Sequence, residues 1–391
     1  RSTVANVETG RQHAPREFWQ SCDDLLGAGG DLLASYDRLT AAIERQAHAE
    51  LRQTHAQLTA GQAGLSGHRV LESPTEILAR RATLHSSALT AELLADLEQL
   101  VVNVVDRYET EGPLALAPET VQARRLVDQL LAGNQRLHQR ARLFELAGKL
   151  SGQLSYMAIN LGNFRAARAY GAEAFELARF IGHDDLSAWV RGTQSLAAYY
   201  TSDYRQSLVL AQDGQRYAKN GIQAVRLAIN GEARALGKLR DRRGVTEAVT
   251  NAYRLLECFP PAAGMTPCIS FGIYSEARTA SNAATAYLSI ADTKQVLTYT
   301  EYATRIVDAS PSRWSRALVR LDTATALLKG EKPEPEGASL LGSEAIAAAR
   351  YMRIESIRQR TRDLATELRP WLHLPIVAEF LNEADIWLGR G

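Results

Sequence analysis

The residue types that perform covalent catalysis are scattered along this chain and match no known catalytic pattern. Nucleophile-elbow, phosphate-loop, HExxH and EF-hand motifs are all missing, and each of those chemistries needs its residues at a fixed spacing. His48 and His55 are seven residues apart, but no cysteine or acidic ligand set joins them, so we expect surface histidines rather than a metal site. Cys258 and Cys268 flank a proline-rich segment and are expected to be buried or loop residues rather than a redox pair. We therefore expect no enzyme activity, no metal and no cofactor.

The residues best suited to binding lie in the middle of the chain and combine aromatic rings with amide and guanidinium donors. Rings stack on the apolar parts of a ligand, while the donors bond its carbonyl or carboxylate groups. Such a set would suit a peptide or a small polar molecule, although its aromatic members fit equally well as packing between helices. The set consists of Tyr156, Asn160, Trp189, Tyr199, Tyr200, Asn230, Arg234 and Arg278.

The elements that must position these residues are helices. Apolar residues recur three and four apart along almost the whole chain and β-branched alternation is rare, which predicts an all-α fold. One helix is predicted over residues 31–60. A second begins at the capping box Ser73-Pro-Thr-Glu76 and runs to about Tyr108, with Gly112-Pro113 as its stop. A third is predicted over about residues 119–145.

A repeated pattern comes after these helices. Segments 161–167, 201–207 and, more weakly, 242–248 each carry a short turn between two helices, and segment 290–296 is a degenerate fourth copy. The turn residues Phe164, Tyr204 and Val245 are about forty residues apart, a period typical of solenoids. Small residues fall where the two helices of a pair would cross, which allows close packing. They are Ser155, Ala167, Ala174, Ser195, Ser207 and Gly214.

These units resemble tetratricopeptide repeats, although the family's tryptophan position holds Ser151 in the first unit and Arg191 in the second. The resemblance implies a right-handed superhelical stack of helical hairpins whose first helices line the inner face. The eight candidate binding residues fall on those first helices. The resemblance to tetratricopeptide repeats covers about 150 residues, with weaker helical pairs continuing to the C-terminus.

The first nineteen residues form a second informative segment. Small polar residues open it, Val4 and Val7 would be buried anchors, and Glu8-Thr9-Gly10-Arg11 ends it before Pro15. This segment resembles the recognition helix, and the start of the next helix, in the phage-repressor-type (xenobiotic-response-element) helix-turn-helix family. The resemblance implies base contacts from Arg1, Ser2 and Asn6 and phosphate contacts from Thr3 and Arg11. The alternative is a capped helix of another kind, since residues 1–60 hold six basic and eight acidic side chains rather than a basic footprint.

Together with Phe18-Trp19 and segment 22–33, the two resemblances match actinobacterial transcriptional regulators that join this helix-turn-helix to a tetratricopeptide region. In that family two helices precede the recognition helix, and they are not within these 391 residues. We therefore expect residues 1–391 alone to bind DNA weakly or not at all, and the complete N-terminal domain to bind double-stranded DNA.

Composition limits where such contacts can come from. Lysine plus arginine, 45, nearly balances aspartate plus glutamate, 44, so there is no overall basic field and any DNA contact must be local. Three cysteines without a CxxC pair predict a reducing, cytoplasmic setting. No apolar run is long enough to predict a membrane span.

The sequence thus predicts three parts: the C-terminal portion of a helix-turn-helix domain (1–30), a long helical connector (31–146) and a tetratricopeptide-like repeat domain (147–391). The resemblance implies a DNA-binding regulator whose repeats bind a peptide, small-molecule or protein signal, or mediate a homodimer. The 31–60 helix is the candidate for transmitting the signal or dimerising. The alternative is a repeat scaffold for protein–protein interaction that does not bind DNA.

Overall fold

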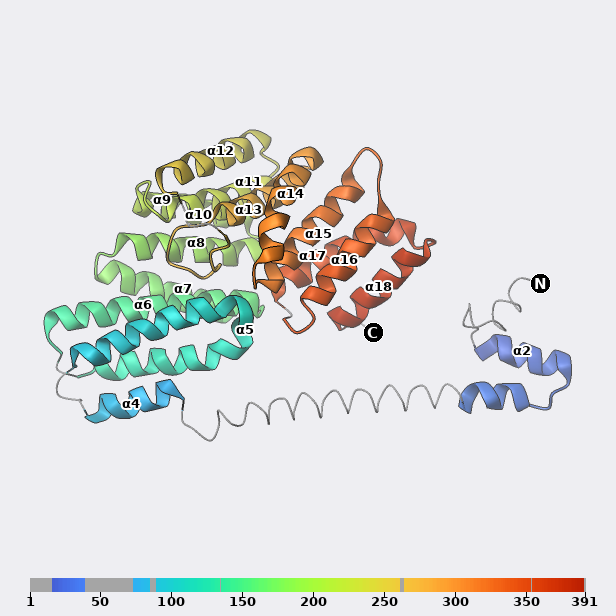
Figure 1. Ribbon diagram of the computed structural model, residues 1–391, viewed down its shortest axis with the longest axis horizontal. Helices are drawn as coiled ribbons and strands as arrows, with labels where there is room; N and C mark the ends of the chain where they lie inside the picture. The colour runs from blue at the N-terminus through green and yellow to red at the C-terminus, as the bar shows by residue number, and fades with distance from the viewer. Residues whose placement is uncertain are drawn as a thin grey trace. The chain divides into compact units, whose positions relative to one another are not determined.

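The computed structural model describes residues 16–38, 73–84, 89–133, 135–260, 264–352 and 354–389. Within these ranges the regular structure is helical and contains no strand (Figure 1), which confirms the all-α prediction. None of the described helices is both long and apolar enough to cross a bilayer. The chain divides into two compact units, Arg1–Pro74 and Thr75–Gly391.

The smaller unit is described only in part. Its helix α2 (Arg16–Leu26) is followed by a helical segment over residues 31–38. The buried carboxylate of Asp23 accepts two backbone N–H groups at the start of that segment, at 2.9 and 2.7 Å, and Trp19 stacks on Tyr36 with 6.2 Å between ring centroids. Most of the predicted 31–60 helix lies outside the described residues, as do the predicted DNA contacts Arg1, Ser2, Thr3, Asn6 and Arg11.

The larger unit is a succession of helices that pack mainly on their neighbours in sequence (Figure 1). Its elements are α4 (Pro74–Leu84), α5 (Ala91–Leu131), α6 (Leu137–Asn160), α7 (Phe164–Phe180), α8 (Asp184–Tyr200), α9 (Tyr204–Ala218), α10 (Ala224–Arg226), the π-helix η2 (Leu227–Ala233), α11 (Arg234–Lys238), α12 (Arg242–Cys258), α13 (Glu276–Ser289), α14 (Thr293–Ala309), α15 (Arg313–Lys329), α16 (Pro335–Ala348), α17 (Glu355–Leu368), the short 3-10 helix η3 (Arg369–Trp371) and α18 (Pro375–Leu388).

The prediction of one helix from Ser73 to Tyr108 is wrong, because the structure has two helices there, α4 and the first half of α5. Thr90 is extended (φ −80°, ψ 158°) and its side chain caps the start of α5. The predicted stop at Gly112 is confirmed, since its φ of +80° and ψ of 174° belong to a region that essentially only glycine adopts. Gln135 bonds the backbone on both sides of this bend, accepting from Leu89 N–H and donating to Leu130 C=O. The two halves of α5 therefore run back on each other.

The helix predicted over residues 119–145 is also wrong. The chain leaves α5 at Ala132 and starts α6 only after Arg136, which is extended. No glycine-proline pair marks this break, and the apolar periodicity therefore predicted a single helix across it.

Among the described residues, five turns between helices share one geometry. In each, a residue with left-handed φ between +57° and +74° precedes a residue whose side chain caps the next helix, and whose own N–H returns to the carbonyl five residues earlier. The two-residue pairs are Gly162-Asn163, Gly182-His183, Ser202-Asp203, Arg240-Asp241 and Ala291-Asp292. The structural equivalent of Phe164 and Tyr204 in the third copy is Arg242, so the predicted position of Val245 was wrong by three residues.

The predicted small-residue crossings are confirmed by a repeated contact. Ser155 Oγ donates to the Ala167 carbonyl at 2.7 Å, and forty residues later Ser195 Oγ donates to the Ser207 carbonyl at the same distance. All six small residues are buried. The larger unit is therefore a stack of helical hairpins with a repeated internal contact.

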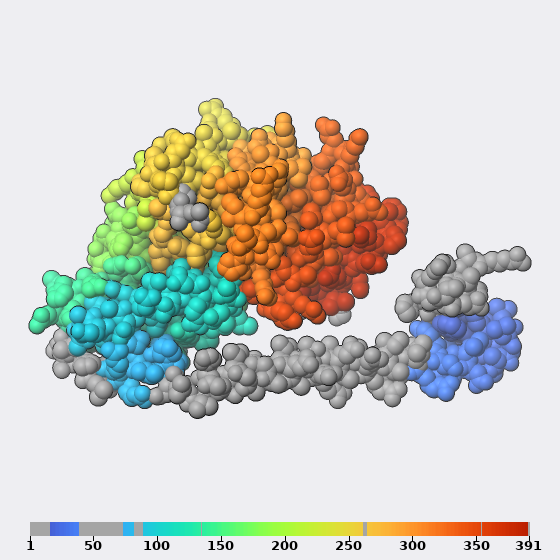
Figure 2. Space-filling model, in the orientation of Figure 1, coloured from blue at the N-terminus to red at the C-terminus, as the bar shows by residue number. Residues whose placement is uncertain are grey.

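The stack curves until late helices meet early ones. Helix α15 packs on α5 and α17 on α6, and Tyr108 meets Trp314 edge to face with 5.0 Å between centroids. Figure 2 shows the orange segment lying against the cyan one. The larger unit begins at Thr75, so α5 belongs to the same compact unit as the hairpins that follow it.

Candidate ligand-binding site

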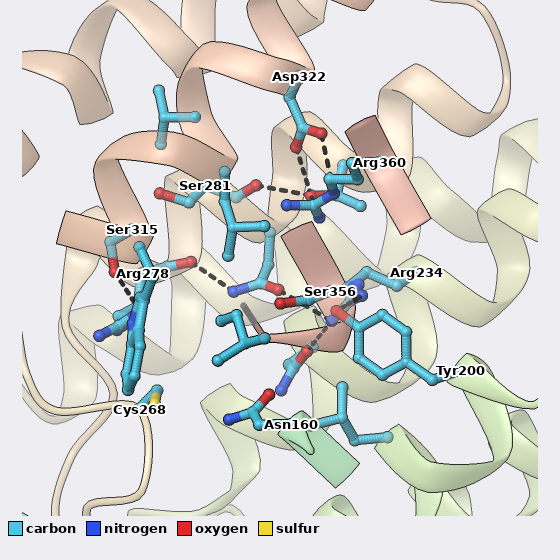
Figure 3. Close-up of a pocket in the computed structure, with 18 of the residues that line it drawn as sticks. Asn160, Tyr200, Arg234, Cys268, Arg278, Ser281, Ser315, Asp322, Ser356 and Arg360 are labelled. Carbon is cyan, nitrogen blue, oxygen red and sulfur yellow. Dashed lines mark hydrogen bonds and ion pairs between the residues drawn. The ribbon is translucent and has the colours of Figure 1, made fainter. Parts of the chain in front are cut away.

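The curvature of the stack encloses a polar cavity, here called the central cavity. Its walls come mostly from the first helices of successive hairpins, which are α6, α8, η2 with α11, α13, α15 and α17, and Figure 3 shows labelled side chains from these helices facing a common space. The centres of water molecules can occupy about 70 Å³ of it, enough for several waters or a small chemical group. Of the eight predicted binding residues, six line this cavity: Tyr156, Asn160, Tyr200, Asn230, Arg234 and Arg278.

The two other predicted residues lie elsewhere. Trp189 is fully buried, and its indole N–H donates to the Ser270 carbonyl at 2.8 Å. Tyr199 packs edge to face on Tyr200 and Tyr204 and borders a neighbouring groove. The structure therefore gives Trp189 the packing role that was the alternative for the aromatic residues.

A π-helix positions two of the cavity residues. Helix α10, η2 and α11 succeed one another without a break, and η2 holds Asn230 while Arg234 comes directly after it. A π-helical segment inserts an extra residue per turn and is found frequently at functional sites. Gly231 within it lies so close to α9 that an added Cβ would come within 2.6 Å of Ala211 Cβ. Tight packing on one side thus directs Asn230 and Arg234 to the cavity on the other.

Arg234 is a buried cation with neutral hydrogen-bond partners. Its side chain donates to Asn230 Oδ1, to Tyr200 Oη at 3.2 Å and, at 3.5 Å, to Asn282 Oδ1, and it lies over the Tyr199 ring at 4.2 Å. The residue is 3% exposed. Its Nε has no hydrogen-bond partner in the described part of the chain, and no carboxylate there pairs with it.

Arg226 is a second buried cation of this kind, located behind the cavity wall. Its guanidinium lies 4.6 Å from the Trp189 ring centroid and 5.6 Å from that of Tyr156, and Nη2 donates to Thr193 Oγ1 at 3.2 Å. Nε and Nη1 lack partners among the described residues. Burial lowers the pKa of Arg226, because a charge without a counter-ion is costly away from water.

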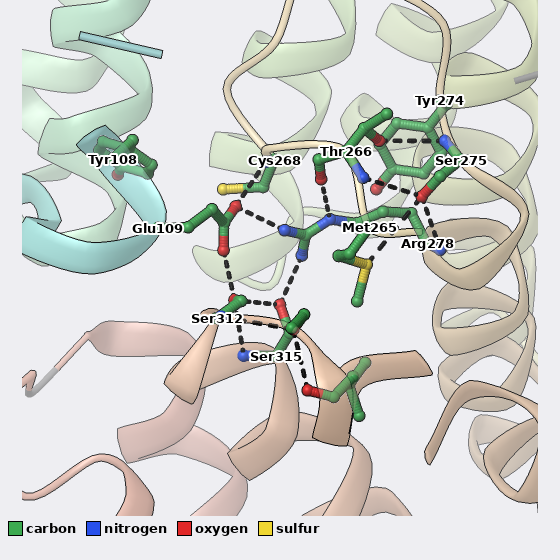
Figure 4. Close-up of polar contacts among 12 residues, drawn as sticks. Tyr108, Glu109, Met265, Thr266, Cys268, Tyr274, Ser275, Arg278, Ser312 and Ser315 are labelled. Carbon is green, nitrogen blue, oxygen red and sulfur yellow. Dashed lines mark hydrogen bonds and ion pairs between the residues drawn. The ribbon is translucent and has the colours of Figure 1, made fainter. Parts of the chain in front are cut away.

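Arg278, by contrast, is fully engaged in a buried cluster that joins distant segments (Figure 4). It donates to Glu109 Oε1 at 2.5 Å, Ser315 Oγ at 2.8 Å and the Thr266 carbonyl at 2.9 Å. Glu109 also accepts from Cys268 N–H at 2.6 Å and from the Ser312 hydroxyl. The cluster links α5, the loop before α13, α13 itself and α15, so Arg278 holds the cavity wall together.

A second ion pair closes the cavity on the side of α17. Arg360 Nε lies 3.2 Å from Asp322 Oδ1, and Thr285 Oγ1 bridges the two, donating to Asp322 Oδ2 at 2.7 Å and accepting from Arg360 Nη2 at 2.9 Å. Asp322 is buried. Two of the three cavity arginines are thus paired with carboxylates, whereas Arg234 has no carboxylate partner among the described residues.

The cavity continues into a wider cleft, here called the outer groove, with a volume of about 560 Å³. Six basic and three acidic side chains line it, so its balance is positive. The residues shared by cavity and groove form a neck between them: Tyr200, Arg234, Thr285, Asp322, Ser356 and Arg360.

The arginines at the neck affect the pKa of the tyrosine that lies beside them. Burial alone would raise the pKa of Tyr200, but the guanidinium groups of Arg234 and Arg360 lower it below its ordinary value. For Tyr156, farther into the cavity, burial dominates and raises the pKa. The guanidinium groups that line the neck thus outweigh the effect of burial at Tyr200.

Sequence reasoning missed Asp322, Arg360 and Arg226. Asp322 is buried in α15, as are Val319 three residues before it and Leu321 next to it. A charged residue on a buried helix face is the signal that could have identified it. Arg226 carries the same signal, because it lies between apolar residues in the buried stretch Ala224-Val-Arg-Leu-Ala-Ile229. Arg360 does not, because its helix α17 is mostly polar.

Among the described residues no cluster of three or more histidine, cysteine or acidic side chains could hold a metal ion, and His48 and His55 lie outside them. Cys268 is buried, which raises the pKa of its thiol, and Cys258 is exposed. A scan of protein-family models and a search of curated proteins gave no match to this chain.

Proposed function

We propose that this protein is a transcriptional regulator whose hairpin stack senses a ligand and alters DNA binding by an N-terminal helix-turn-helix. The observation that carries the sensing role is the central cavity. Helices from α6 to α17 supply polar side chains to one small space, and among them Arg234 is buried without a counter-ion in the described part of the chain. Buried polar groups of this kind cost stability unless something pairs with them.

The enclosure of the cavity supports a coupling role. A ligand bound there would touch hairpins from α6 to α17 at once. It could therefore favour one curvature of the stack over another, and such a preference is required of any ligand that shifts a conformational equilibrium. In a homodimer a change of curvature would alter the spacing of two DNA-binding heads, and half-site spacing decides which operators they match.

The DNA-binding role is supported by the resemblance of residues 1–19 to a recognition helix. It is tested by immunoprecipitating the protein, expressed from its own gene, with the DNA it binds and mapping the fragments. We expect discrete genomic sites that share a sequence motif. A profile no different from an untagged control would contradict the proposal.

A second candidate is a scaffold that binds a protein partner without DNA. The outer groove favours it, because a cleft of about 560 Å³ with excess basic side chains would suit an acidic peptide segment. Absence of genomic sites together with a stable protein complex that is lost in Arg362→Glu would support this alternative.

A further inference from the structure

Arg234 gives the central cavity a chemical preference that goes beyond the sensing of an unspecified ligand. Of the cavity arginines, Arg278 pairs with Glu109 and Arg360 with Asp322. Arg234, at 3% exposure, has amide and phenol oxygens as its partners among the described residues. Two tyrosine ring faces, at 4.2 and 5.5 Å from its guanidinium carbon, offset part of its charge.

The Nε–Nη2 edge of Arg234 fits one kind of anion. Nε is unpartnered in the described part of the chain, and the adjacent Nη2 holds Tyr200 by a long bond of 3.2 Å. An Nε–Nη edge offers two parallel N–H donors at the spacing of the two oxygens of a carboxylate. Nε is buried, so a carboxylate would reach and satisfy it by displacing the Tyr200 phenol from its weak contact with Nη2.

The size of the two spaces determines where the rest of the ligand lies. The inner cavity has room for a small group, about 70 Å³ for water centres, whereas the outer groove provides about 560 Å³. Arg234 belongs to the neck that joins them. A ligand whose acid group reaches the neck would therefore extend its remaining atoms into the groove.

We propose that the central cavity is a carboxylate site, with Arg234 as the residue that binds the acid group of an organic ligand whose body lies in the outer groove. This inference rests on the proposed sensing function. The same chemistry is offered by a small organic acid and by the C-terminal carboxylate of a short peptide.

The first test measures stability without any ligand, using Arg234→Met and Arg278→Met in the full chain. A residue retained for binding contributes little to folding, so R234M should change the melting temperature by less than about 3 °C, or raise it. R278M leaves Glu109 buried and unpaired, and should lower the melting temperature by about 6 °C or more. If R234M lowers it as much as R278M, or fails to fold, Arg234 is structural and the inference is overturned.

The second test measures binding by the shift of melting temperature at constant ionic strength. The probes are hexanoate and its neutral amide, tetra-alanine and its C-terminal amide, and inorganic phosphate. We expect a concentration-dependent rise with one or both free acids and none with the amides, with the rise lost in R234M and kept in Arg305→Met, a control at an exposed arginine of α14. Hexanoate alone identifies a small acid, and tetra-alanine alone a peptide terminus.

Two outcomes overturn the inference. One is a response to phosphate or to the amides that equals the response to the acids, and the other is no response to either acid. The proposed regulator function is tested separately, by the presence of genomic binding sites. If the inference fails but genomic sites are found, the regulator stands with another ligand class; if an acid binds at Arg234 and no genomic sites are found, the carboxylate site stands on a protein that is not a regulator.

Discussion

At the scale of single residues, the larger unit depends on a few buried charges that join segments far apart in the chain. Glu109 is the clearest case, because α5, the loop before α13, α13 and α15 all meet at its carboxylate. Its side chain and that of Arg278 are each 7% exposed, so water can replace neither partner if the other is removed.

Replacing Glu109 by Gln should therefore destabilise the protein by about 3–5 kcal/mol, because Arg278 would remain buried without its counter-ion. Urea unfolding followed by circular dichroism measures this. The control is Glu301→Gln, which breaks the exposed pair of Glu301 with Arg305 and should cost less than about 1 kcal/mol. Equal losses for the two variants would show that the Glu109 cluster does not hold the segments together.

A pH dependence is expected at the contact between α6 and α8. Hydrogen bonds from His183 and Lys149 lower the pKa of Glu145 to about 2. Because this folded-state pKa is depressed, its stabilisation is present above the unfolded pKa of about 4.3 and is lost as the pH falls toward 2.

The gap in urea midpoint between the wild type and Glu145→Gln should therefore be full at pH 6 and shrink as the pH falls from about 4.3 toward 2. Solvent exposure of the pair keeps the effect small, on the order of 1 kcal/mol. A gap that stays constant over this range would mean that the charge of Glu145 does not contribute.

At the scale of elements, the repeated turn between helices sets the geometry of the stack. Two of its members differ informatively at the left-handed position, where Gly182 has φ +67° and Ser202 has φ +63°. An L residue with a side chain is strained there, whereas glycine is not.

Ser202→Gly should therefore stabilise the protein slightly, by about 0.5 kcal/mol after the entropy gained by the unfolded chain. The reverse change at the equivalent turn, Gly182→Ala, should cost about 1 kcal/mol. No atom lies within 4 Å of the Cβ added there, so that loss would be backbone strain alone. Both are measured by thermal unfolding, and shifts of the same sign would contradict a shared turn geometry.

The sequence predicted some helix ends and turns of this fold and missed others. The repeated turns were found because Asn163, Asp203 and Asp292 are short polar caps beside apolar helices, and such signals are local. The bend at Gly112 was found for the same reason. The break between α5 and α6 was missed although Gly133-Asn134 offers turn chemistry there, because the apolar spacing continues on both sides of it.

The candidate site was predicted where a residue's type reveals its role and missed where only tertiary pairing does. Asn230 and Arg234 were found as polar residues on an inner helix, but the π-helix that positions them left no periodic mark. The difference between Arg278, which is neutralised by a residue 169 positions away, and Arg234, which is not, depends on long-range contacts. Sequence spacing holds no information about these contacts.

At the scale of the whole molecule, the hairpin stack brings its late helices back onto its early ones and places a basic neck between a small cavity and a wider groove. A ligand at the neck would touch helices from α8 to α17. Under the proposed function, occupancy of this cavity changes how the protein binds DNA.

The most direct test compares genomic occupancy of the wild type, Arg234→Met and Arg305→Met, each expressed from the protein's own gene under identical growth conditions. Coupling between two sites typically changes affinity by at least about fivefold. The account predicts discrete sites for the wild type, unchanged occupancy for R305M and a change of about that size for R234M at equal protein levels. Discrete sites with the same occupancy in all three proteins would contradict it.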